Sequence, residues 1–190
     1  MNGPLDHWLG YRDLLPLKVD ALSAEPTAAA LEHWHDQNLR TLHAIAVLDE
    51  RHRGGESGGA LETEVERLHQ KIDVVLELLG AMLRSGRAGI VSTPVRLSRE
   101  GLSWPADERS PPAGSLVLAA VELHACAPFA LCWPAESLGI HDGEVCARFR
   151  EMSEAMGAAL EKLVFTRHRR SVASLRLPAG AGAPSGPPRQ

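Results

Sequence analysis

The 190-residue sequence has no excess of basic residues. Its 20 Lys and Arg residues are outnumbered by 24 Asp and Glu residues, which gives a net charge of −4 and an isoelectric point near 6.1. A general nucleic-acid or polyanion binder needs a basic surface, so the composition argues against that class. A local basic cluster at residues 167–170 leaves nucleic-acid recognition as a minor hypothesis, behind the two given at the end of this section. We expect no nucleic-acid partner.

The sequence also lacks a secretory leader and a long apolar run. Residues 1–10 contain neither the basic region nor the apolar core of a signal peptide. No stretch approaches the ~18 apolar residues that cross a bilayer. With 44% apolar residues, the chain can still build a core in one domain with an appendage, or in two small domains. We therefore expect a cytoplasmic protein without a membrane span.

Cysteine is scarce, and the three cysteines are Cys126, Cys132 and Cys146. An odd number without a secretory signal argues against a disulfide framework. Cys126 and Cys132 lie near His124 in the sequence, but their spacing matches no common zinc pattern and a fourth ligand is missing. We expect these cysteines to be buried in strands, and we expect neither a metal nor a cofactor.

Catalytic motifs are missing as well. His33 and His35 are two residues apart and so face different sides of a helix, and no His-Glu-x-x-His zinc pair is present. The glycines within residues 54–59 do not follow a strand and lack the Lys-Ser/Thr ending of a phosphate loop. No Gly-x-Ser-x-Gly elbow occurs. The sequence therefore argues against an enzyme.

A regular apolar repeat runs through the middle of the chain. Its side chains are spaced alternately four and three residues apart, which is the heptad pattern of helices that share a packed seam. Leu76 and Leu78 flank this seam and favour a bundle of more than two helices, formed within the chain, between chains or both. The alternative is an ordinary core helix of one globular domain. The a and d positions are Leu61, Val65, Leu68, Ile72, Val75, Leu79 and Met82.

Helical patterns occur in three segments. An apolar stripe that follows Thr27, a predicted helix cap, indicates a first helix to about residue 53. Glycine-rich residues 54–59 separate it from the heptad helix, which is predicted over residues 61–83. A third helix is predicted over residues 151–168. The residues beyond 178 have nothing to bury and are expected to be disordered.

The remaining apolar segments have the period of strands. Alternation over residues 95–99, followed by Gly101 and an apolar run, predicts a hairpin, and further strands are predicted over 115–123, 129–133 and 145–149. Residues 14–19 are interrupted by proline, which suits an edge strand or an extended arm. Short strands of this kind predict a small antiparallel β-barrel and an α+β fold. The expected organisation is an N-terminal arm or edge strand (1–26), a two-helix oligomerisation module (27–86), a barrel with a C-terminal helix (87–177) and a disordered tail (178–190).

Two cationic features are candidates for ligand binding. Arg167-His168-Arg169-Arg170 closes the third predicted helix. Basic residues there either hold phosphates or complement the helix dipole and stay solvated, and the solvated interpretation is favoured. The second feature is the hairpin Arg96-Leu97-Ser98-Arg99-Glu100-Gly101. Its serine can hydrogen-bond a ligand or its own turn, and its glycine permits a close backbone approach.

The order of these pieces resembles the atypical, tetrameric branch of the bacterial PilZ domain family. The shared order is a long helix, the heptad helix, the hairpin at 95–102, an apolar strand at 114–118, and Val164-Phe165 running into the basic cluster. The resemblance covers about residues 14–176. It implies a six-stranded PilZ-like barrel, a C-terminal helix packed on it, and inserted long helices that assemble subunits into a tetramer.

The resemblance also implies a ligand, cyclic di-GMP, the bacterial second messenger that governs motility, biofilm formation and virulence. Classical members hold it with an Arg-x-x-x-Arg segment and an Asp/Asn-x-Ser-x-x-Gly motif, because arginines pair with phosphates and stack on guanines. Ser98 and Gly101 match the second motif, whereas Arg96 replaces its first residue. The segment from Arg84 to Arg87 has one residue too few between its arginines for the first motif.

Two functional hypotheses follow. The first is a non-enzymatic, oligomeric cyclic di-GMP signalling protein that acts on a protein partner in motility, biofilm or virulence signalling. The second is a coiled-coil oligomeric adaptor whose PilZ-like barrel no longer binds the nucleotide, and the departures from the ligand motifs favour it. The candidate ligand contacts are Arg84, Arg87, Arg96, Ser98 and Gly101, and the oligomerisation residues are the heptad positions together with Leu76.

Overall fold

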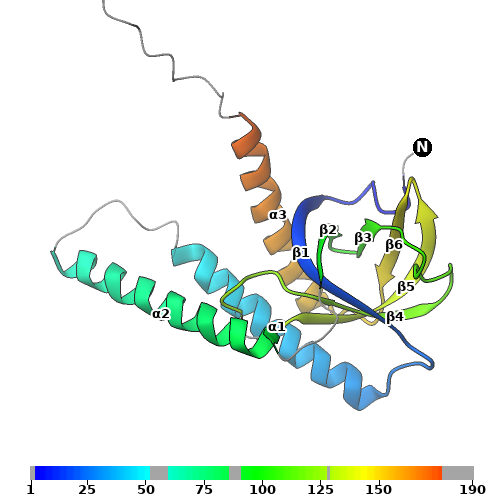
Figure 1. Ribbon diagram of the computed structural model, residues 1–190, viewed down its shortest axis with the longest axis horizontal. Coiled ribbons are helices and arrows are strands. Elements are labelled where there is room, and N and C mark those ends of the chain that lie inside the picture. Colours follow the sequence, from blue (N-terminus) through cyan, green and yellow to red (C-terminus); the bar gives the residue numbers. More distant parts are fainter. Residues whose placement is uncertain (1–2, 52–59, 86–90, 128, 177–190) are drawn as a thin grey trace, which may run out of the picture.

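The computed structural model describes residues 3–51, 60–85, 91–127 and 129–176, and it contains a six-stranded barrel with helices on one side (Figure 1). All strand pairs are antiparallel, in the closed order β1-β2-β3-β6-β5-β4. The α+β class and the antiparallel barrel predicted from the sequence are confirmed. The elements are β1 Gly10–Ala21, α1 Ala28–Arg51, α2 Ala60–Ser85, β2 Val91–Ser98, β3 Gly101–Pro105, β4 Leu116–Val121, β5 Leu131–His141, β6 Glu144–Phe149 and α3 Glu154–Arg176.

The first strand is an integral part of the barrel. β1 pairs with β2 from Gly10 to Leu17 and with β4 from Leu17 to Ala21. The expectation of an edge strand or an arm is therefore wrong, because a closed barrel has no edge. Pro16 is tolerated because it lies where β1 passes from one neighbour to the other, and its carbonyl accepts a hydrogen bond from the Glu122 amide at 3.0 Å.

Alternating apolar side chains fill the interior of the barrel. Val95, Leu97 and Leu102 from the β2–β3 hairpin are at most 1% exposed, and they share the core with residues of β4, β5 and β6. Trp133 and Phe149 stack with ring centroids 4.7 Å apart. Burial of apolar surface stabilises the folded state by about 25 cal/mol per Å². The barrel therefore has its own hydrophobic core, formed by residues of a single chain.

Two helices pack on the barrel and on each other. α3 packs against β1 and β2, and α1 packs against α3 and β5. Thr27 caps α1 as predicted, since its hydroxyl accepts a hydrogen bond from the Ala30 amide at 3.3 Å. α3 continues to Arg176, beyond the predicted end at His168. The basic cluster therefore lies inside the helix, where it does not complement a C-terminal dipole.

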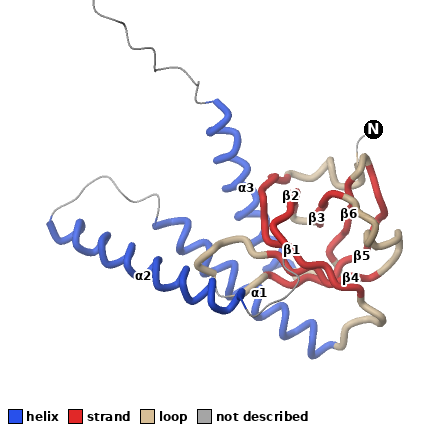
Figure 2. The backbone as a smooth tube through the Cα atoms, viewed as in Figure 1, coloured by secondary structure: helices blue, strands red, loops and turns tan. Residues whose placement is uncertain are grey.

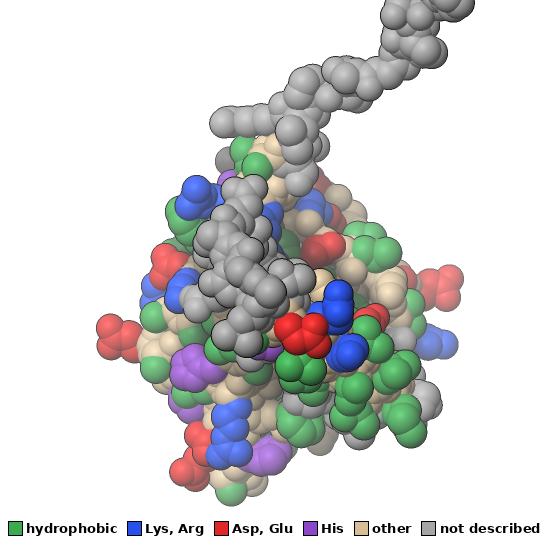
Figure 3. Space-filling model, turned by 90° about the vertical axis from the view of Figure 1, so that its left-hand side faces the viewer, with side chains coloured by type: hydrophobic (Ala, Val, Ile, Leu, Met, Phe, Trp, Pro, Cys, Tyr) green, Lys and Arg blue, Asp and Glu red, His purple; other side chains and the backbone are tan. Residues whose placement is uncertain are grey.

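α2 projects away from the barrel (Figures 1 and 2), and the apolar side chains along it are exposed. The described heptad side chains are between 42% and 72% exposed, from Val65 to Met82. Leu76, on the adjoining side of the helix, is half-buried. Figure 3, viewed from the side on which α2 projects, shows hydrophobic side chains gathered at the surface. The side chain of Leu61 and the predicted tail at 178–190 lie outside the described residues.

Candidate functional site

Two residues of the predicted ligand motif close the β2–β3 turn. The hydroxyl of Ser98 accepts a hydrogen bond from the Gly101 amide at 3.2 Å and donates one to the Gly101 carbonyl at 3.0 Å. Ser98 is fully buried. A Cβ atom on Gly101 would lie 2.1 Å from the carbonyl oxygen of Ala147 on β6, so only glycine fits there. In this conformation both residues shape the hairpin.

The third motif residue, Arg96, holds the N-terminal segment, defined here as residues 3–9. Its guanidinium donates from Nη1 to the Leu5 carbonyl at 3.1 Å and from Nη2 to the Trp8 carbonyl at 2.9 Å. Leu5 itself is only 2% exposed. Any ligand that contacts the guanidinium of Arg96 through these nitrogens must therefore compete with two backbone carbonyls.

A small polar hollow of about 130 Å³ lies next to Arg96. Glu144 forms its centre, because it pairs with Arg12 and accepts a hydrogen bond from the Ser103 hydroxyl at 2.6 Å. The hydrogen bond from Arg12, with that from Ser103, holds the pKa of Glu144 below its usual value despite partial burial. The hollow therefore presents a carboxylate that is already paired.

The other two candidate contacts cannot be placed beside the hairpin. α2 ends at Ser85, but the side chain of Arg84 and the whole of Arg87 lie outside the described residues. The structure thus brings Arg96, Ser98 and Gly101 together on one hairpin.

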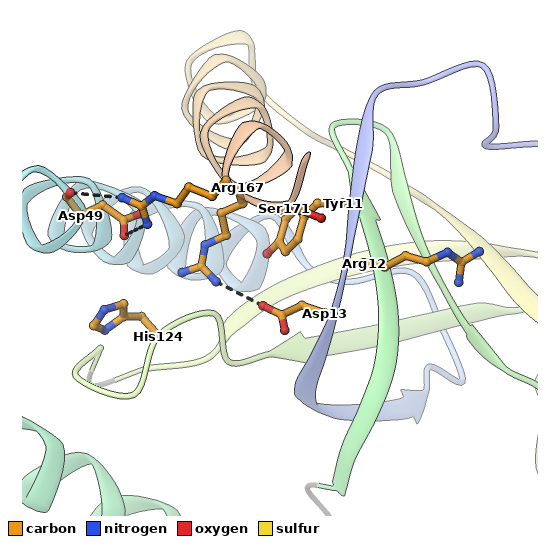
Figure 4. Close-up of a pocket in the computed structure, with 8 residues that line it drawn as sticks. Tyr11, Arg12, Asp13, Asp49, His124, Arg167 and Ser171 are labelled. Atoms are coloured by element: carbon orange, nitrogen blue, oxygen red, sulfur yellow. Dashed lines mark hydrogen bonds and ion pairs between the residues drawn. The ribbon is translucent and has the colours of Figure 1, made fainter. Parts of the chain in front are cut away.

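A larger pocket of about 490 Å³ lies where four parts of the chain meet (Figure 4). We call it the α3 pocket. β1, the end of α1, the loop after β4 and the last turns of α3 each contribute side chains to it. The residues used below are Tyr11, Asp13, Asp49, His124, Arg167, Arg170 and Ser171.

Arg167 lies at the centre of the α3 pocket. Its Nη2 donates to the Leu123 carbonyl at 2.7 Å, and Nη1 lies 3.8 Å from the carboxylate of Asp13. The guanidinium also lies over the ring of Tyr11, with Cζ 5.8 Å from the centroid. Arg167 therefore links α3 to β1 and to the loop after β4.

The rest of the basic cluster divides between packed and exposed residues. Arg170 donates to the Asp49 carboxylate at 2.9 Å and to its backbone carbonyl at 3.3 Å, and a ring nitrogen of His168 lies 3.0 Å from the Gly10 carbonyl. Arg169 is exposed and lies over Phe165, with Cζ 5.7 Å from the ring centroid. The solvated interpretation thus holds for Arg169 and is wrong for Arg167 and His168, which are half-buried against protein partners. Arg170 is exposed but pairs with Asp49.

Two buried donors in the α3 pocket have no acceptor among the described residues. They are the Tyr11 hydroxyl and Nε of Arg167. Burial raises the pKa of Tyr11 to about 12, so its hydroxyl keeps its proton at neutral pH. A buried donor without an acceptor typically costs about 1–3 kcal/mol.

Sequence reasoning missed the α3 pocket. Tyr11, Asp49 and His124 come from three elements far apart in the sequence, and no spacing relates them. The one available signal was the three-residue spacing of Arg167 and Arg170, which places both on one side of a helix.

The positions of the cysteines and the character of the helices bear on metal binding and on membrane insertion. Cys146 is buried in β6 and Cys132 is half-buried in β5, but Cys126 lies in a loop and not in a strand as expected. Within the described ranges, no group of three or more His, Cys, Asp or Glu residues is arranged to hold a metal ion. No helix among the described residues has the length and apolar character needed to cross a membrane.

Comparison with known proteins relates the chain to a protein family and to a solved structure. Residues 39–177 match the profile of the family described as atypical PilZ domain, cyclic di-GMP receptor. A solved structure, described as a pathogenic protein from Xanthomonas campestris with a tetrameric PilZ domain self-assembled through an unusual helical bundle, superposes with a TM-score of 0.67. It shares 24% sequence identity, over 87% of this chain and 91% of that chain. No curated protein sequence matched.

Proposed function

Because the chain belongs to the atypical PilZ domain family, we propose that it is a non-enzymatic signalling protein of the cyclic di-GMP system that assembles through α2 and acts on a protein partner. The observation that supports this function is the family match, which begins within α1 and covers α2, α3 and every strand except β1. By the same reasoning we place its action in the cytoplasm and its partner in motility, biofilm or virulence signalling.

We propose that cyclic di-GMP is the ligand and that the β2–β3 hairpin contacts it. Arg96 supplies a cation on the outer side of the barrel, beside the turn closed by Ser98 and Gly101. The guanidinium of Arg96 now donates to neutral carbonyls, whereas a phosphate carries a negative charge and accepts two parallel hydrogen bonds from a guanidinium. A phosphate can therefore compete with the carbonyls of Leu5 and Trp8. Arg84 and Arg87 remain proposed contacts.

We also propose that residues 27–86 form the oligomerisation module and that α2 packs in a tetramer. Exposed apolar residues lie at the a and d positions and also on one neighbouring side, at Val74 and Leu78. A helix with two adjoining apolar sides can contact two other helices, as in a four-helix bundle. The tetrameric assembly of the Xanthomonas campestris protein through a helical bundle supports this arrangement.

Calorimetric titration of the full chain with cyclic di-GMP tests the ligand. We expect saturable heat in the micromolar range from the native chain and a loss of about tenfold or more in affinity for Arg96→Ala, because the guanidinium supplies the charge. Arg109→Ala, in the exposed loop between β3 and β4, is the matched control and should bind normally. Absence of heat at high ligand concentration would contradict direct binding and leave the oligomeric adaptor.

A further inference from the structure

The α3 pocket lies apart from the β2–β3 hairpin. Tyr11 and Asp13 turn toward α3, whereas the side chain of Arg12, between them, points the other way and pairs with Glu144 (Figure 4). We infer that the α3 pocket is a second binding site, which takes a small anion bearing a phosphate group. This site does not depend on the proposed binding of cyclic di-GMP at Arg96.

The donors for a phosphate come from one side of α3. Arg167, Arg170 and Ser171 are separated by three and four residues, so their side chains emerge next to one another. Guanidinium groups match the geometry of phosphate oxygens and bind them through two parallel hydrogen bonds. The ring of His124 lies across the pocket from them (Figure 4). The pocket thus collects cationic and hydrogen-bonding side chains from two elements.

The two donors without an acceptor also point to a ligand. The Tyr11 hydroxyl and Nε of Arg167 both belong to side chains that line the α3 pocket, and both are shielded from solvent. Neither an additional arginine nor a metal would satisfy them, because both groups donate. An oxyanion offers several acceptor oxygens. It is therefore a ligand that completes the hydrogen bonding of this pocket.

The acidic residues of the pocket allow an anion to enter. Asp49 stays with Arg170 and orients it, since the Asp49 side chain is only 11% exposed. Asp13 is held less firmly, because it lies 3.8 Å from Arg167 and its side chain is 49% exposed. If Asp13 turns toward solvent, the guanidinium of Arg167 is released from this ion pair. An anion then gains attraction that the resting ion pairs do not cancel.

The volume of the pocket sets the size of the ligand. At about 490 Å³ it lies within the range of small-molecule sites. Free inorganic phosphate and the phosphate of a mononucleotide share the chemistry that these residues recognise. The test therefore includes both, with inorganic phosphate and GMP as separate probes.

Calorimetric titration of the full chain, at an ionic strength held constant with sodium chloride, measures binding of each probe. We expect saturable binding and a loss of about tenfold or more for Arg170→Gln, because a charge-assisted hydrogen bond disappears. Arg109→Gln removes the same charge outside the pocket and should bind as the native chain does. Binding of GMP but not of phosphate would identify a nucleotide site, and equal binding of both would identify a phosphate site. Both results support the inference.

Tyr11→Phe separates a binding role from a structural one. Because the hydroxyl has no acceptor in the described structure, its removal should raise or preserve the melting temperature without a probe. The same variant should lose part of the melting-temperature increase that the bound probe gives to the native chain. Two results would overturn the inference: no saturable binding of either probe at millimolar concentration, or binding that Arg170→Gln and Tyr11→Phe leave unchanged.

Discussion

The barrel and α2 are both rich in apolar side chains, but they use them differently. The barrel buries its alternating residues, and Leu97, Leu102 and Val145 are fully covered by the same chain. α2 leaves its heptad residues about half exposed, with Ile72 at 49% and Leu79 at 51%. In a closed barrel, every second residue of a strand faces the interior, where the other strands of the same chain cover it. A heptad side is complete only when another helix packs on it.

The largest expected effect is on assembly. Replacing Ile72 and Leu79 with Asp should cost several kcal/mol of association per subunit, because unpaired charges would be buried in the seam. Light scattering should then report a smaller particle, while the β-sheet signal in circular dichroism persists. Gln70→Asp adds the same kind of charge on the polar side of α2 and should leave the mass unchanged. An unchanged particle mass for the double variant would refute assembly through α2.

The next effect concerns the barrel alone. Gly101→Ala should lower the free energy of unfolding by about 3 kcal/mol, since the new methyl group would overlap the Ala147 carbonyl and force β3 from β6. Thermal unfolding measures the change. Gly114→Ala is the comparison, because Gly114 has a φ of 81° but open space around it, and it should cost about 1 kcal/mol. Equal losses would mean that the close approach at Gly101 has no special cost.

A third prediction concerns the contact between α1 and the barrel. The Asn38 side chain, 1% exposed, donates to the Cys132 carbonyl at 2.7 Å and accepts from the Cys132 amide at 2.9 Å. Asn38→Ala removes both of these buried hydrogen bonds and should cost about 2 kcal/mol in chemical denaturation. Gln37→Ala removes a single longer bond of 3.3 Å to the Ala130 carbonyl and should cost less. The reverse order would contradict the role of Asn38.

The smallest effect is a pH dependence at Glu144. Its pKa is lowered in the folded protein, so its contribution to stability is present above the unfolded pKa and is lost as pH falls through the folded pKa. Glu144→Gln should therefore flatten the acid side of a plot of melting temperature against pH. The change should stay below about 1 kcal/mol because Arg12 is 60% exposed. An unaltered acid slope would show that the pair contributes nothing.

Local patterns predicted most of the fold, and contacts between distant segments decided the rest. The hairpin at Gly101 and the cap at Thr27 follow from short-range rules, and both occur. Pro16 led to the prediction that β1 is an edge strand. The pairing of β1 with β4 joins segments about 100 residues apart, and neighbouring residues do not predict it. α3 was predicted too short for the same reason, since Arg167 and Arg170 have partners on β1 and α1.

The predicted hairpin residues show a similar limit. The spacing of Ser98 and Gly101 identified them, but not the hydrogen bonds that they make to each other. The carbonyls that accept hydrogen bonds from Arg96 belong to Leu5 and Trp8, some 90 residues earlier in the chain. Sequence spacing can therefore select a segment and still leave its partners unknown.

β1 and β2 are hydrogen-bonded neighbours, and Leu17 is paired directly with Val91. β1 and β2 thus form a β-hairpin, and its connecting segment contains both α1 and α2. Closing a loop becomes harder only with the logarithm of its length, by about 0.6 kcal/mol for each doubling. The barrel would therefore lose little stability if this connection were lengthened. A design that extends α2 by whole heptads should change the reach and strength of the assembly and leave the folding of the barrel almost as it is.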